Sequence, residues 1–578
     1  MADPSNSELA AALDELGDLY ELDGAIVHRV VAYRNAAKAI RESPEPVARM
    51  VREGRVTSLP GVGKTLEEKL TVLLQAGSIP AAEKLRAKFP PGVVEMTRLP
   101  GLGPKRARRL YDEAGIDSLD ALRAAAEQGR IRELKGFGPK AETALLEALD
   151  AHAERPAGTR VLLPAALEAA ERILEGLRKV PAVARAEIAG SARRLADSVK
   201  DLDIVVASDD PAAVGEAFAA LDVIGASAGG DGGSRGLTQN GVSVDLRIVP
   251  PATFGNLLQH FTGSKQHNVH LREMAVRRGL HVSEHGVLDD ATGETTLCES
   301  EEQVYERLGL AWVEPELRED RGELDPEFEH PQLVTQDDLR GDLHCHTVAS
   351  DGRATIAEMA RAALDLGHEY LAITDHSASH GFGNHVSPED LLRQIEAVRE
   401  ADAQIDGIRL LAGSEVNVLP DGSLDYDDGL LEQLDWVIAS VHTSFRMGGD
   451  AITERVVRAV EHPLVDVLGH PTGRLIERRP GYDVDIAAVI DAAARSGTFL
   501  EINGQPDRRD LRDTHARAAA QAGVKLVLSS DAHRTTTLGR QRWAVATARR
   551  AWLTAAEVAN ALPWEKLDAL RRGAPKRA

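Results

Sequence analysis

The spacing of hydrophobic positions changes along the chain, and the changes predict three kinds of region. Up to residue 180, apolar residues recur three or four positions apart, as in LPAALEAAERILEGLRKV at 163–180, which is typical of amphipathic helices. Apolar and polar residues then alternate in DLDIVVA at 201–207 and SVDLRIV at 243–249, as in half-buried strands. From Leu339 onward, short apolar runs alternate with helical stretches, which favours parallel strands connected by helices.

A chain of 578 residues exceeds what one hydrophobic core organises, so we expect several domains. The patterns predict a helical region at 1–155, an α+β region at 156–315, an acidic linker at 316–338 and an α/β region at 339–578. The net charge of -23 is unevenly distributed. Residues 29–150 hold 22 Lys/Arg against 16 Asp/Glu, a local net of +6, whereas residues 314–340 hold 3 against 10, a net of -7. The first of these segments suits a polyanionic partner.

Cysteine usage and hydropathy exclude several classes of protein. The only cysteines, Cys298 and Cys345, lie in different segments, so we expect neither a disulfide framework nor a thiolate zinc site. No apolar run has membrane length, and the N-terminal segment is acidic and amphipathic rather than a signal sequence. We therefore expect a soluble cytoplasmic protein without a membrane partner, in which any metal is bound by histidines and carboxylates.

One short motif occurs three times in the basic region: LPGVGKTLEEKL from Leu59, LPGLGPKRARRL from Leu99 and LKGFGPKAETALL from Leu134. The paired glycines permit a tight turn that exposes backbone N–H groups at a helix N-terminus, where a phosphate oxygen binds favourably. A turn that only connects two helices is the alternative for a single copy, whereas three copies followed by basic residues favour contacts with the nucleic-acid backbone. The predicted DNA-binding glycines are Gly61, Gly63, Gly101, Gly103, Gly136 and Gly138.

Lys69 lies on the helix that the first motif opens, six residues after Gly63, and Tyr33, Arg34 and Lys38 lie upstream. A lysine amine held near other cations or in a dry pocket can lose its proton and attack an aldehyde as a Schiff-base nucleophile. The alternative is an ordinary solvated lysine on a helix surface.

Three aspartates on strand patterns form the first predicted catalytic site. Asp201 and Asp203 alternate in one strand and therefore share a face, and Asp245 lies in a second strand of the same kind. Carboxylates in this arrangement suit two Mg²⁺ or Mn²⁺ ions, which promote in-line attack of a 3′-hydroxyl on a triphosphate. Upstream, Gly190, Ser191 and Arg194 can present N–H, hydroxyl and guanidinium groups to that triphosphate.

The second predicted site takes its ligands from the ends of successive strands in the C-terminal region. In a barrel of parallel strands the carboxyl ends and the following loops meet at one mouth, so residues placed there converge. Nine ligands are too many for one tetrahedral ion and suit two or three Mn²⁺ or Zn²⁺ ions. Cys345 alternates with the histidines beside it, so we expect it to pack in the core. The predicted ligands are His344, His346, Asp351, His376, Glu415, His442, His470, Asp531 and His533. Arg474 and Asn503 are predicted to contact phosphate or to support the ligands.

With these motifs, residues 1–315 resemble the family X DNA polymerases, the relatives of DNA polymerase beta. HFTGSKQHNVHLR from His260 is similar to the segment beside the thumb in that family. The resemblance implies that Phe261 and Gly263 bracket the incoming sugar and that Asn268 and Arg272 lie near the minor-groove edge of the nascent pair. It also places Lys69 where the lyase nucleophile of the family lies. His260 stands where the family commonly has tyrosine, and Ser243 where many members have arginine, so sugar selectivity and fidelity are not implied.

Residues 344–533 resemble the PHP (polymerase and histidinol phosphatase) domain, which implies a distorted (β/α)₇ barrel with metal-dependent phosphoesterase activity. Together the two resemblances imply a repair polymerase that fills short gaps, as in base excision repair, with a 3′–5′ exonuclease and abasic-site processing as further activities. Gapped or primed DNA and deoxynucleoside triphosphates are the implied substrates, with a monovalent cation at the helix-hairpin-helix motifs and a monomeric state. Two alternatives stay open, in which the barrel is an inactive structural platform or hydrolyses a small phosphomonoester.

Overall fold

A computed structural model describes the chain, which divides into two compact units. The described residues are 4–571 except 5, 44–45, 98, 100–101, 135, 140, 144, 147–148, 150–159, 231, 380 and 382–383. Unit 1 comprises Met1–Arg160, Leu167–Glu187 and Lys200–Val249, and unit 2 comprises Val161–Ala166, Ile188–Val199 and Pro250–Ala578. No helix in the described part of the chain is long and apolar enough to span a membrane.

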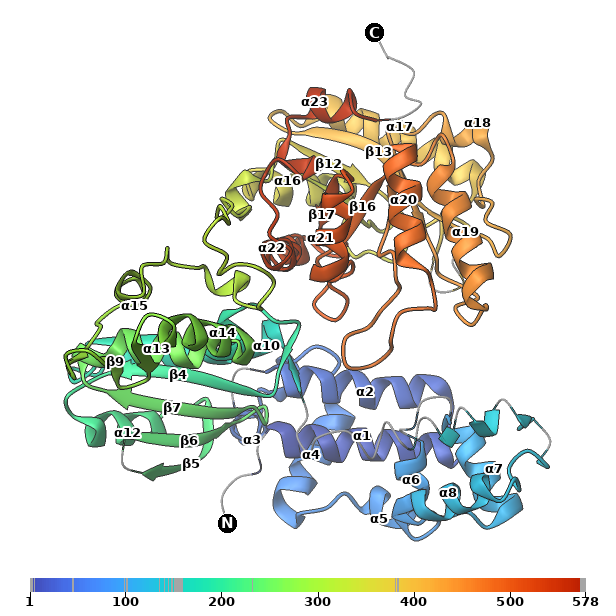
Figure 1. The fold of residues 1–578 in the computed structure, drawn as a ribbon. Coiled ribbons are helices and arrows are strands. Elements are labelled where there is room, and N and C mark those ends of the chain that lie inside the picture. Colours follow the sequence, from blue (N-terminus) through green and yellow to red (C-terminus); the bar gives the residue numbers. More distant parts are fainter. Residues whose placement is uncertain are drawn as a thin grey trace. The chain divides into compact units, whose positions relative to one another are not determined.

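The N-terminal part of unit 1 is helical, as its sequence pattern predicts (Figure 1). Leucines spaced three positions apart along the first helix, such as Leu13, Leu16 and Leu19, are fully buried in a shared core. The helices are α1 (Asn6–Leu22), α2 (Val27–Glu42), α3 (Val47–Arg52), α4 (Lys64–Ala76), α5 (Pro80–Arg86), α6 (Pro91–Met96), α7 (Pro104–Ala114) and α8 (Leu119–Glu127), with the 3₁₀ turn η1 (Val56–Ser58).

A five-stranded sheet follows, in the order β2-β4-β7-β6-β5. The central pair, β4 and β7, is parallel. Burial alternates along β7 and over the first four residues of β4, as in the sequence, and the rest of β4 is buried. The elements are β2 (Arg185–Ile188), β4 (Asp201–Ala207), β5 (Ile224–Gly230), β6 (Gly233–Thr238) and β7 (Ser243–Val249), with α10 (Leu163–Leu177), α12 (Pro211–Ala219), and the two-stranded pair β1 (Val161–Leu162) and β3 (Ser198–Val199).

The first part of unit 2 packs helices against a small antiparallel sheet around a separate core. The acidic segment that follows is folded onto this core: Arg318 is fully buried and pairs with Glu301 at 2.6 Å, and Glu323 accepts a hydrogen bond from His267 at 2.7 Å. The elements are η2 (Pro251–Thr253), α13 (Phe254–Thr262), α14 (Lys265–Val276), β8 (Leu280–Ser283), β9 (Gly286–Asp289), β10 (Thr295–Thr296), α15 (Glu301–Arg307), η3 (Pro315–Leu317) and η4 (Gln336–Asp338), and α11 (Gly190–Arg193) also belongs to this unit.

The rest of unit 2 is a barrel of seven parallel strands in sequence order, which confirms the predicted (β/α)₇ fold (Figure 1). A parallel bridge between Cys345 and Ala532 joins the first strand to the segment after the last. Cys345 is buried, as predicted. The strands are β11 (Gly341–Cys345), β12 (Tyr370–Ile373), β13 (Arg409–Asn417), β14 (Trp436–Ser440), β15 (Val467–Leu468), β16 (Phe499–Asn503) and β17 (Leu526–Ser529).

Helices cover the outside of the barrel, and short polar residues begin several of them. Thr355 forms a capping box with Glu358, and Ser387 and Asp485 cap two further helices through their side-chain oxygens. The helices are α16 (Ile356–Asp365), α17 (Pro388–Gln404), α18 (Asp428–Leu431), α19 (Gly449–Glu461), α20 (Ile486–Ser496), α21 (Asp513–Gln521), α22 (Gln541–Arg550) and α23 (Trp564–Asp568), with the 3₁₀ turns η5 (Thr535–Arg540) and η6 (Ala559–Ala561).

Candidate metal centre and nucleotidyl-transfer site

Histidine side chains converge on the Glu415 carboxylate at the carboxyl ends of the barrel strands. The carboxylate oxygens of Glu415 lie 2.8 Å from Nε2 of His470, 2.9 Å from Nδ1 of His376 and 3.1 Å from Nε2 of His442. Only 1% of Glu415 is exposed. A buried carboxylate surrounded by imidazoles is a typical first shell for divalent cations that accept nitrogen and oxygen ligands.

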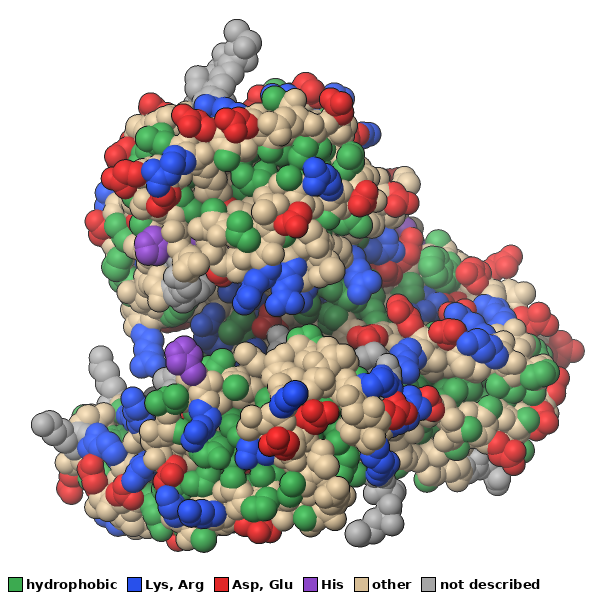
Figure 2. Space-filling view, turned by 180° about the vertical axis from the view of Figure 1, so that it is seen from behind, with side chains coloured by type: hydrophobic (Ala, Val, Ile, Leu, Met, Phe, Trp, Pro, Cys, Tyr) green, Lys and Arg blue, Asp and Glu red, His purple; other side chains and the backbone are tan. Residues whose placement is uncertain are grey.

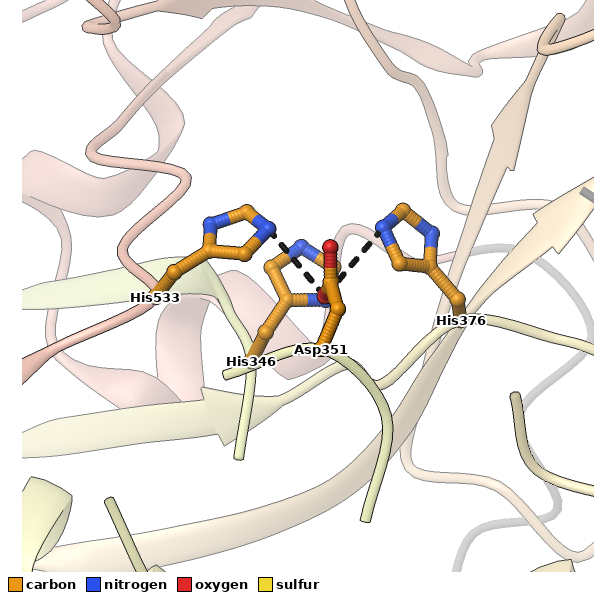
Figure 3. Close-up of side chains that lie close together, drawn as sticks. All are labelled: His346, Asp351, His376 and His533. Atoms are coloured by element: carbon orange, nitrogen blue, oxygen red, sulfur yellow. Dashed lines mark ion pairs between the residues drawn. The ribbon is translucent and has the colours of Figure 1, made fainter. Parts of the chain in front are cut away.

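A group of four side chains lies beside this carboxylate: His346, Asp351, His376 and His533 (Figure 3). Their ligand atoms lie within 4.8 Å of one another. An Asp351 oxygen lies 3.2 Å from Nε2 of His533 and 3.7 Å from Nε2 of His376, and these two ion pairs are drawn in Figure 3. The group combines residues from the segments after β11, β12 and β17, as the strand-end argument predicts.

Two further groups share members with the first. His344, His346 and Asp531 form one, with Nε2 of the two histidines 3.7 and 3.2 Å from an Asp531 oxygen. His376, Glu415 and His442 form the other. Because His346 and His376 each belong to two groups, the three groups adjoin, an arrangement that suits a cluster of ions. Of the nine predicted ligands, His470 alone lies outside these groups among the described residues, and it joins the centre through Glu415.

The electrostatics of the centre also fit bound cations. Burial alone would raise the pKa of Glu415, but His442, His376 and His344 hold that pKa well below its usual range, so the carboxylate is ionised. Burial, together with the neighbouring His533 and His376, lowers the pKa of His346 to about 4, which leaves its imidazole neutral. Nδ1 of His346 is buried and makes no hydrogen bond within the described part of the chain. A neutral buried imidazole is the form that binds a metal.

Sequence reasoning missed several residues that hold these ligands. Glu501, in β16, accepts a hydrogen bond from Nδ1 of His344 at 2.6 Å and one from the backbone N–H of His470 at 2.5 Å. Asp375, the residue before His376, accepts hydrogen bonds from the backbone nitrogen of Thr347 at 2.7 Å and from its hydroxyl at 2.6 Å. Such partners fix ring orientation and tautomer. The available signal was an acid inside an apolar strand, as in FLEIN.

Asn503 and Arg474, the two predicted supporting residues, differ in outcome. The Asn503 amide donates to an Asp531 oxygen at 3.0 Å and therefore supports a ligand. The Arg474 guanidinium instead binds Asp197 at 2.7 Å and the backbone carbonyl of Arg509.

The three predicted catalytic aspartates lie on the central strands of the unit 1 sheet. The register sets Asp203 directly opposite Asp245, and Asp201 opposite Ser243, so the carboxylates share one face. An Asp245 oxygen lies 2.9 Å from the guanidinium of Arg247, an interaction that the sequence did not indicate. Among the described residues, three groups of His, Asp and Glu have ligand atoms within 4.8 Å of one another, and all three lie in the barrel. The metal-binding role of the three aspartates therefore stays a prediction.

The predicted triphosphate residues lie on a short helix of unit 2. Gly190 and Ser191 begin α11, and Gly190 adopts a φ of 63°, which favours glycine. Arg194 follows directly, and its guanidinium donates to the Thr262 carbonyl at 2.6 Å and pairs with Glu319 at 3.1 Å. The side chain is therefore held in one orientation.

The predicted sugar and base-pair residues cluster around the end of α13. Gly263 has a φ of 65° and approaches the Arg194 guanidinium, which lies 3.4 Å from the position of an added Cβ. The Asn268 amide donates to the His260 carbonyl at 2.7 Å, and the exposed Arg272 contacts Nδ1 of His260 at 3.1 Å. Phe261, half-buried, stacks at a tilt on the His260 ring, with centroids 5.5 Å apart.

The three repeated motifs share one backbone geometry. In each copy the fourth residue donates to the carbonyl of the first: Val62 to Leu59 at 3.1 Å, Leu102 to Leu99 at 3.0 Å and Phe137 to Leu134 at 2.9 Å. The second glycine then accepts the first helical hydrogen bond, from Leu66 to Gly63, from Arg106 to Gly103 and from Ala141 to Gly138, at 2.9 Å each. Gly61 and Gly136 have φ values of 81° and 85°, while Gly101 lies outside the described residues.

Lys69 is half-buried on α4. Of the upstream residues, Tyr33 is buried and stacks on Tyr20, and Arg34 pairs with Asp18 at 3.3 Å and with Glu21. The side chain of Lys38 lies outside the described residues.

Comparisons with known proteins agree with this layout. Residues 4–79 match a helix-hairpin-helix domain, 93–151 a SAM-like helix-hairpin-helix tandem, 257–319 the DNA polymerase beta thumb and 342–505 the PHP domain. Phosphoesterase relatives match the barrel alone. A probable phosphatase of Thermoanaerobacter sp. (strain X514) is 34% identical over 38% of this chain and 89% of its own, and a probable phosphatase of Shewanella sediminis is 31% identical over the same shares.

The helix-hairpin-helix motifs, the polymerase thumb and the metal-binding barrel define a DNA-processing enzyme of two catalytic parts. Over 97% of its length, the chain is 36% identical to the DNA polymerase/3′-5′ exonuclease PolX of Bacillus subtilis, covering 98% of that protein. The chain belongs to the bacterial-type family X DNA polymerases that carry a C-terminal PHP domain.

Proposed function

We propose that the chain is a DNA-directed DNA polymerase that fills short gaps during repair, with a 3′–5′ exonuclease in its barrel. Similarity to the B. subtilis enzyme over nearly the whole chain carries the proposal. In this proposal Asp201, Asp203 and Asp245 hold Mg²⁺ or Mn²⁺ for nucleotide addition. Gapped or primed DNA binds through the helix-hairpin-helix turns, which also take a monovalent cation, and the enzyme acts as a cytoplasmic monomer.

At the barrel, the residues that converge on Glu415 would hold two or three Mn²⁺ or Zn²⁺ ions, which supply Lewis-acid catalysis for phosphoester hydrolysis. Glu501 and Asn503 keep the ligands oriented through the hydrogen bonds described above. Imidazole-rich shells favour these ions over Mg²⁺, which prefers oxygen ligands. Intact ligand positions argue against a purely structural barrel.

Arginine-rich loops at the mouth favour a DNA strand over a small monoester as the substrate. Residues 472–481, after His470, and 504–512, after β16, together hold six arginines against three acids. Arg474 and Arg509 bind Asp197, which leaves Arg478, Arg479, Arg508 and Arg512 for a substrate strand. Ile476 donates to the carbonyl of Asp507 at 2.7 Å, so the loops lie side by side. In Figure 2, basic side chains gather at the edge of the barrel that lies away from the C-terminal tail. Successive phosphates of a strand suit such a rim.

The rim also offers an aromatic surface. Phe445 and Tyr482 stack with ring planes 14° apart and centroids at 6.2 Å, and the Arg479 guanidinium lies 4.6 Å from the Phe445 ring centroid. The Tyr482 hydroxyl donates to the carbonyl of Pro471, the residue after His470, at 2.6 Å, which places this surface beside the metal ligands. Arginines with aromatic rings are typical of single-strand binding.

To test the substrate class, full-length protein reconstituted with Mn²⁺ is given 5′-labelled single-stranded DNA or p-nitrophenyl phosphate. Arg508, half-buried and in no ion pair with another described residue, is replaced by glutamine. We expect kcat/KM on DNA to fall about 5–10-fold, since one phosphate contact is lost, and to fall less on the monoester. Arg495→Gln, at an exposed arginine on α20, is the matched control. Faster hydrolysis of the monoester than of DNA by the wild type would instead support the phosphatase alternative.

We further propose that Lys69 acts as a lyase nucleophile in abasic-site processing. Borohydride should trap wild-type protein on a 5′-deoxyribose-phosphate end, and Lys69→Ala should lose at least about 90% of the trapped product, because the Schiff base forms at that amine. Lys84→Ala, on α5, is the matched control and should trap as the wild type does. Undiminished trapping by Lys69→Ala would transfer the role to another lysine, such as Lys64 or Lys38.

A further inference from the structure

Arginines of the barrel grip the loop that follows α11. The backbone carbonyls of three successive residues accept hydrogen bonds: that of Arg194 from Arg550 at 2.6 Å, and those of Leu195 and Ala196 from Arg509 at 3.0 and 3.1 Å. All of these residues belong to unit 2. Because three successive carbonyls accept hydrogen bonds from arginines, the backbone of the loop is held in one conformation.

The next residue, Asp197, binds two of the barrel arginines through its side chain. One oxygen of Asp197 lies 2.7 Å from the Arg474 guanidinium, and the other lies 3.6 Å from that of Arg509. The Ser198 hydroxyl donates to Glu477 at 2.7 Å. Burial would raise the pKa of Asp197, but Arg509 and Arg474 lower it, so the carboxylate is charged when the arginines bind it.

The arginines that bind this loop are buried. Arg509 is fully buried, and its Nε donates to the Thr547 hydroxyl at 2.9 Å, so each of the three guanidinium nitrogens makes a hydrogen bond. Arg550 is 9% exposed and also pairs with Glu319 at 2.8 Å and Asp513 at 3.2 Å. Buried arginines are costly unless bonded in this way, and breaking one partner is strongly destabilising locally. The contact is therefore a fixed part of the fold and not a surface encounter.

The gripped loop has a strained backbone. Leu195 adopts a φ of 56°, a left-handed conformation that a branched residue seldom adopts without support from its surroundings. Arg194, directly before it, carries the guanidinium predicted to bind the triphosphate. Its backbone carbonyl binds Arg550, and its side chain binds Glu319, which also binds Arg550. The barrel thus holds Arg194 from both its backbone and its side chain.

We infer that the barrel contributes to nucleotide binding by the polymerase. Its residues Arg474, Arg509 and Arg550 position the triphosphate-binding loop for the incoming nucleotide. These arginines are positioning residues, since they act through Arg194 and its neighbours. The inference rests on the proposed function of that loop. It assigns to the barrel a role that is separate from phosphoester hydrolysis.

The test is Asp197→Asn in the full-length protein, measured by primer extension on gapped DNA at varied nucleotide concentration. We expect the KM for the nucleotide to rise about ten-fold with kcat changed less than three-fold, because the catalytic aspartates are untouched. Exonuclease activity on the same preparation should stay within two-fold of wild type, which also shows that the barrel is folded. Asp209→Asn, at an exposed aspartate after β4, is the matched control.

A second arm keeps the test decisive if Asp197→Asn is insoluble. Arg474→Gln removes the same ion pair from the other side and should raise the same KM by itself. Where both single variants are soluble, the double variant should raise it no further than the larger single effect. A KM for both single variants within two-fold of wild type, or loss of exonuclease in parallel with the rise in KM, overturns the inference.

Arg194→Gln tests the triphosphate assignment of Arg194 separately from the positioning role of the barrel arginines. An unchanged KM in that variant overturns the triphosphate assignment and the inference together. A raised KM in Arg194→Gln with a wild-type KM in Asp197→Asn overturns the inference alone.

Discussion

Exonuclease activity should fall at least about 100-fold when His344 is replaced by alanine, more than the loss typical of outer-shell partners of a metal site. The His344 ring is clamped between Glu501, 2.6 Å from its Nδ1, and the carboxylates of Glu415 and Asp531, 3.4 and 3.7 Å from its Nε2. Removing it takes away a ligand and leaves Glu501 buried without its imidazole partner. The measurement is the stepwise shortening of 5′-labelled single-stranded DNA with Mn²⁺, Zn²⁺ or Mg²⁺.

The same preparation supplies its own internal check, because primer extension on gapped DNA uses other metal ligands and should persist. His462→Ala is the matched control: this histidine lies at the end of α19, is 25% exposed and pairs with Asp428 at 3.3 Å, away from the centre. Undiminished degradation by His344→Ala would place the nuclease outside the barrel or identify it as a contaminant.

The convergence of the predicted barrel ligands could be foreseen because a local rule governs where they lie. Residues such as His376 and His442 come at the end of an apolar strand run, and parallel strands bring their ends together whatever the details of packing. The (β/α)₇ barrel, which the resemblance to the PHP domain implied, is confirmed. Glu501 was not predicted because an acid within an apolar strand indicates a buried polar contact without identifying the partner, here the imidazole of His344, 157 residues earlier in the chain.

The contacts of the α11 loop lay beyond sequence reasoning for a related reason. Arg474 and Arg509 bind residues 277 and 313 positions earlier in the chain, and nothing in either local pattern distinguishes a buried arginine from a solvated one. The sequence placed Arg474 near phosphate, whereas the structure pairs it with Asp197. Long-range ion pairs of this kind depend on how distant segments of the chain pack together. The hydrophobic periodicity and the composition of the sequence do not indicate that packing.

Nucleotide incorporation should fall about 1000-fold or more in Asp203→Ala and in Asp245→Ala, the order of loss expected when a charged group that stabilises the transition state is removed. The two residues are direct neighbours across the β4 and β7 register, so in the proposed site both carboxylates would bind the same cations. In Asp245→Ala the Arg247 guanidinium, 2.9 Å from the native carboxylate, also loses this ion pair.

Single-nucleotide gap filling with Mg²⁺ and with Mn²⁺ measures this loss, and exonuclease activity of the same variants should remain near that of the wild type. The two outcomes together separate the sites, because a general folding defect would reduce both activities. Asp209→Asn serves again as the control, since its exposed side chain lies just beyond the end of β4. Primer extension near the wild-type rate by either alanine variant would remove the aspartates from catalysis and leave the polymerase site elsewhere on the chain.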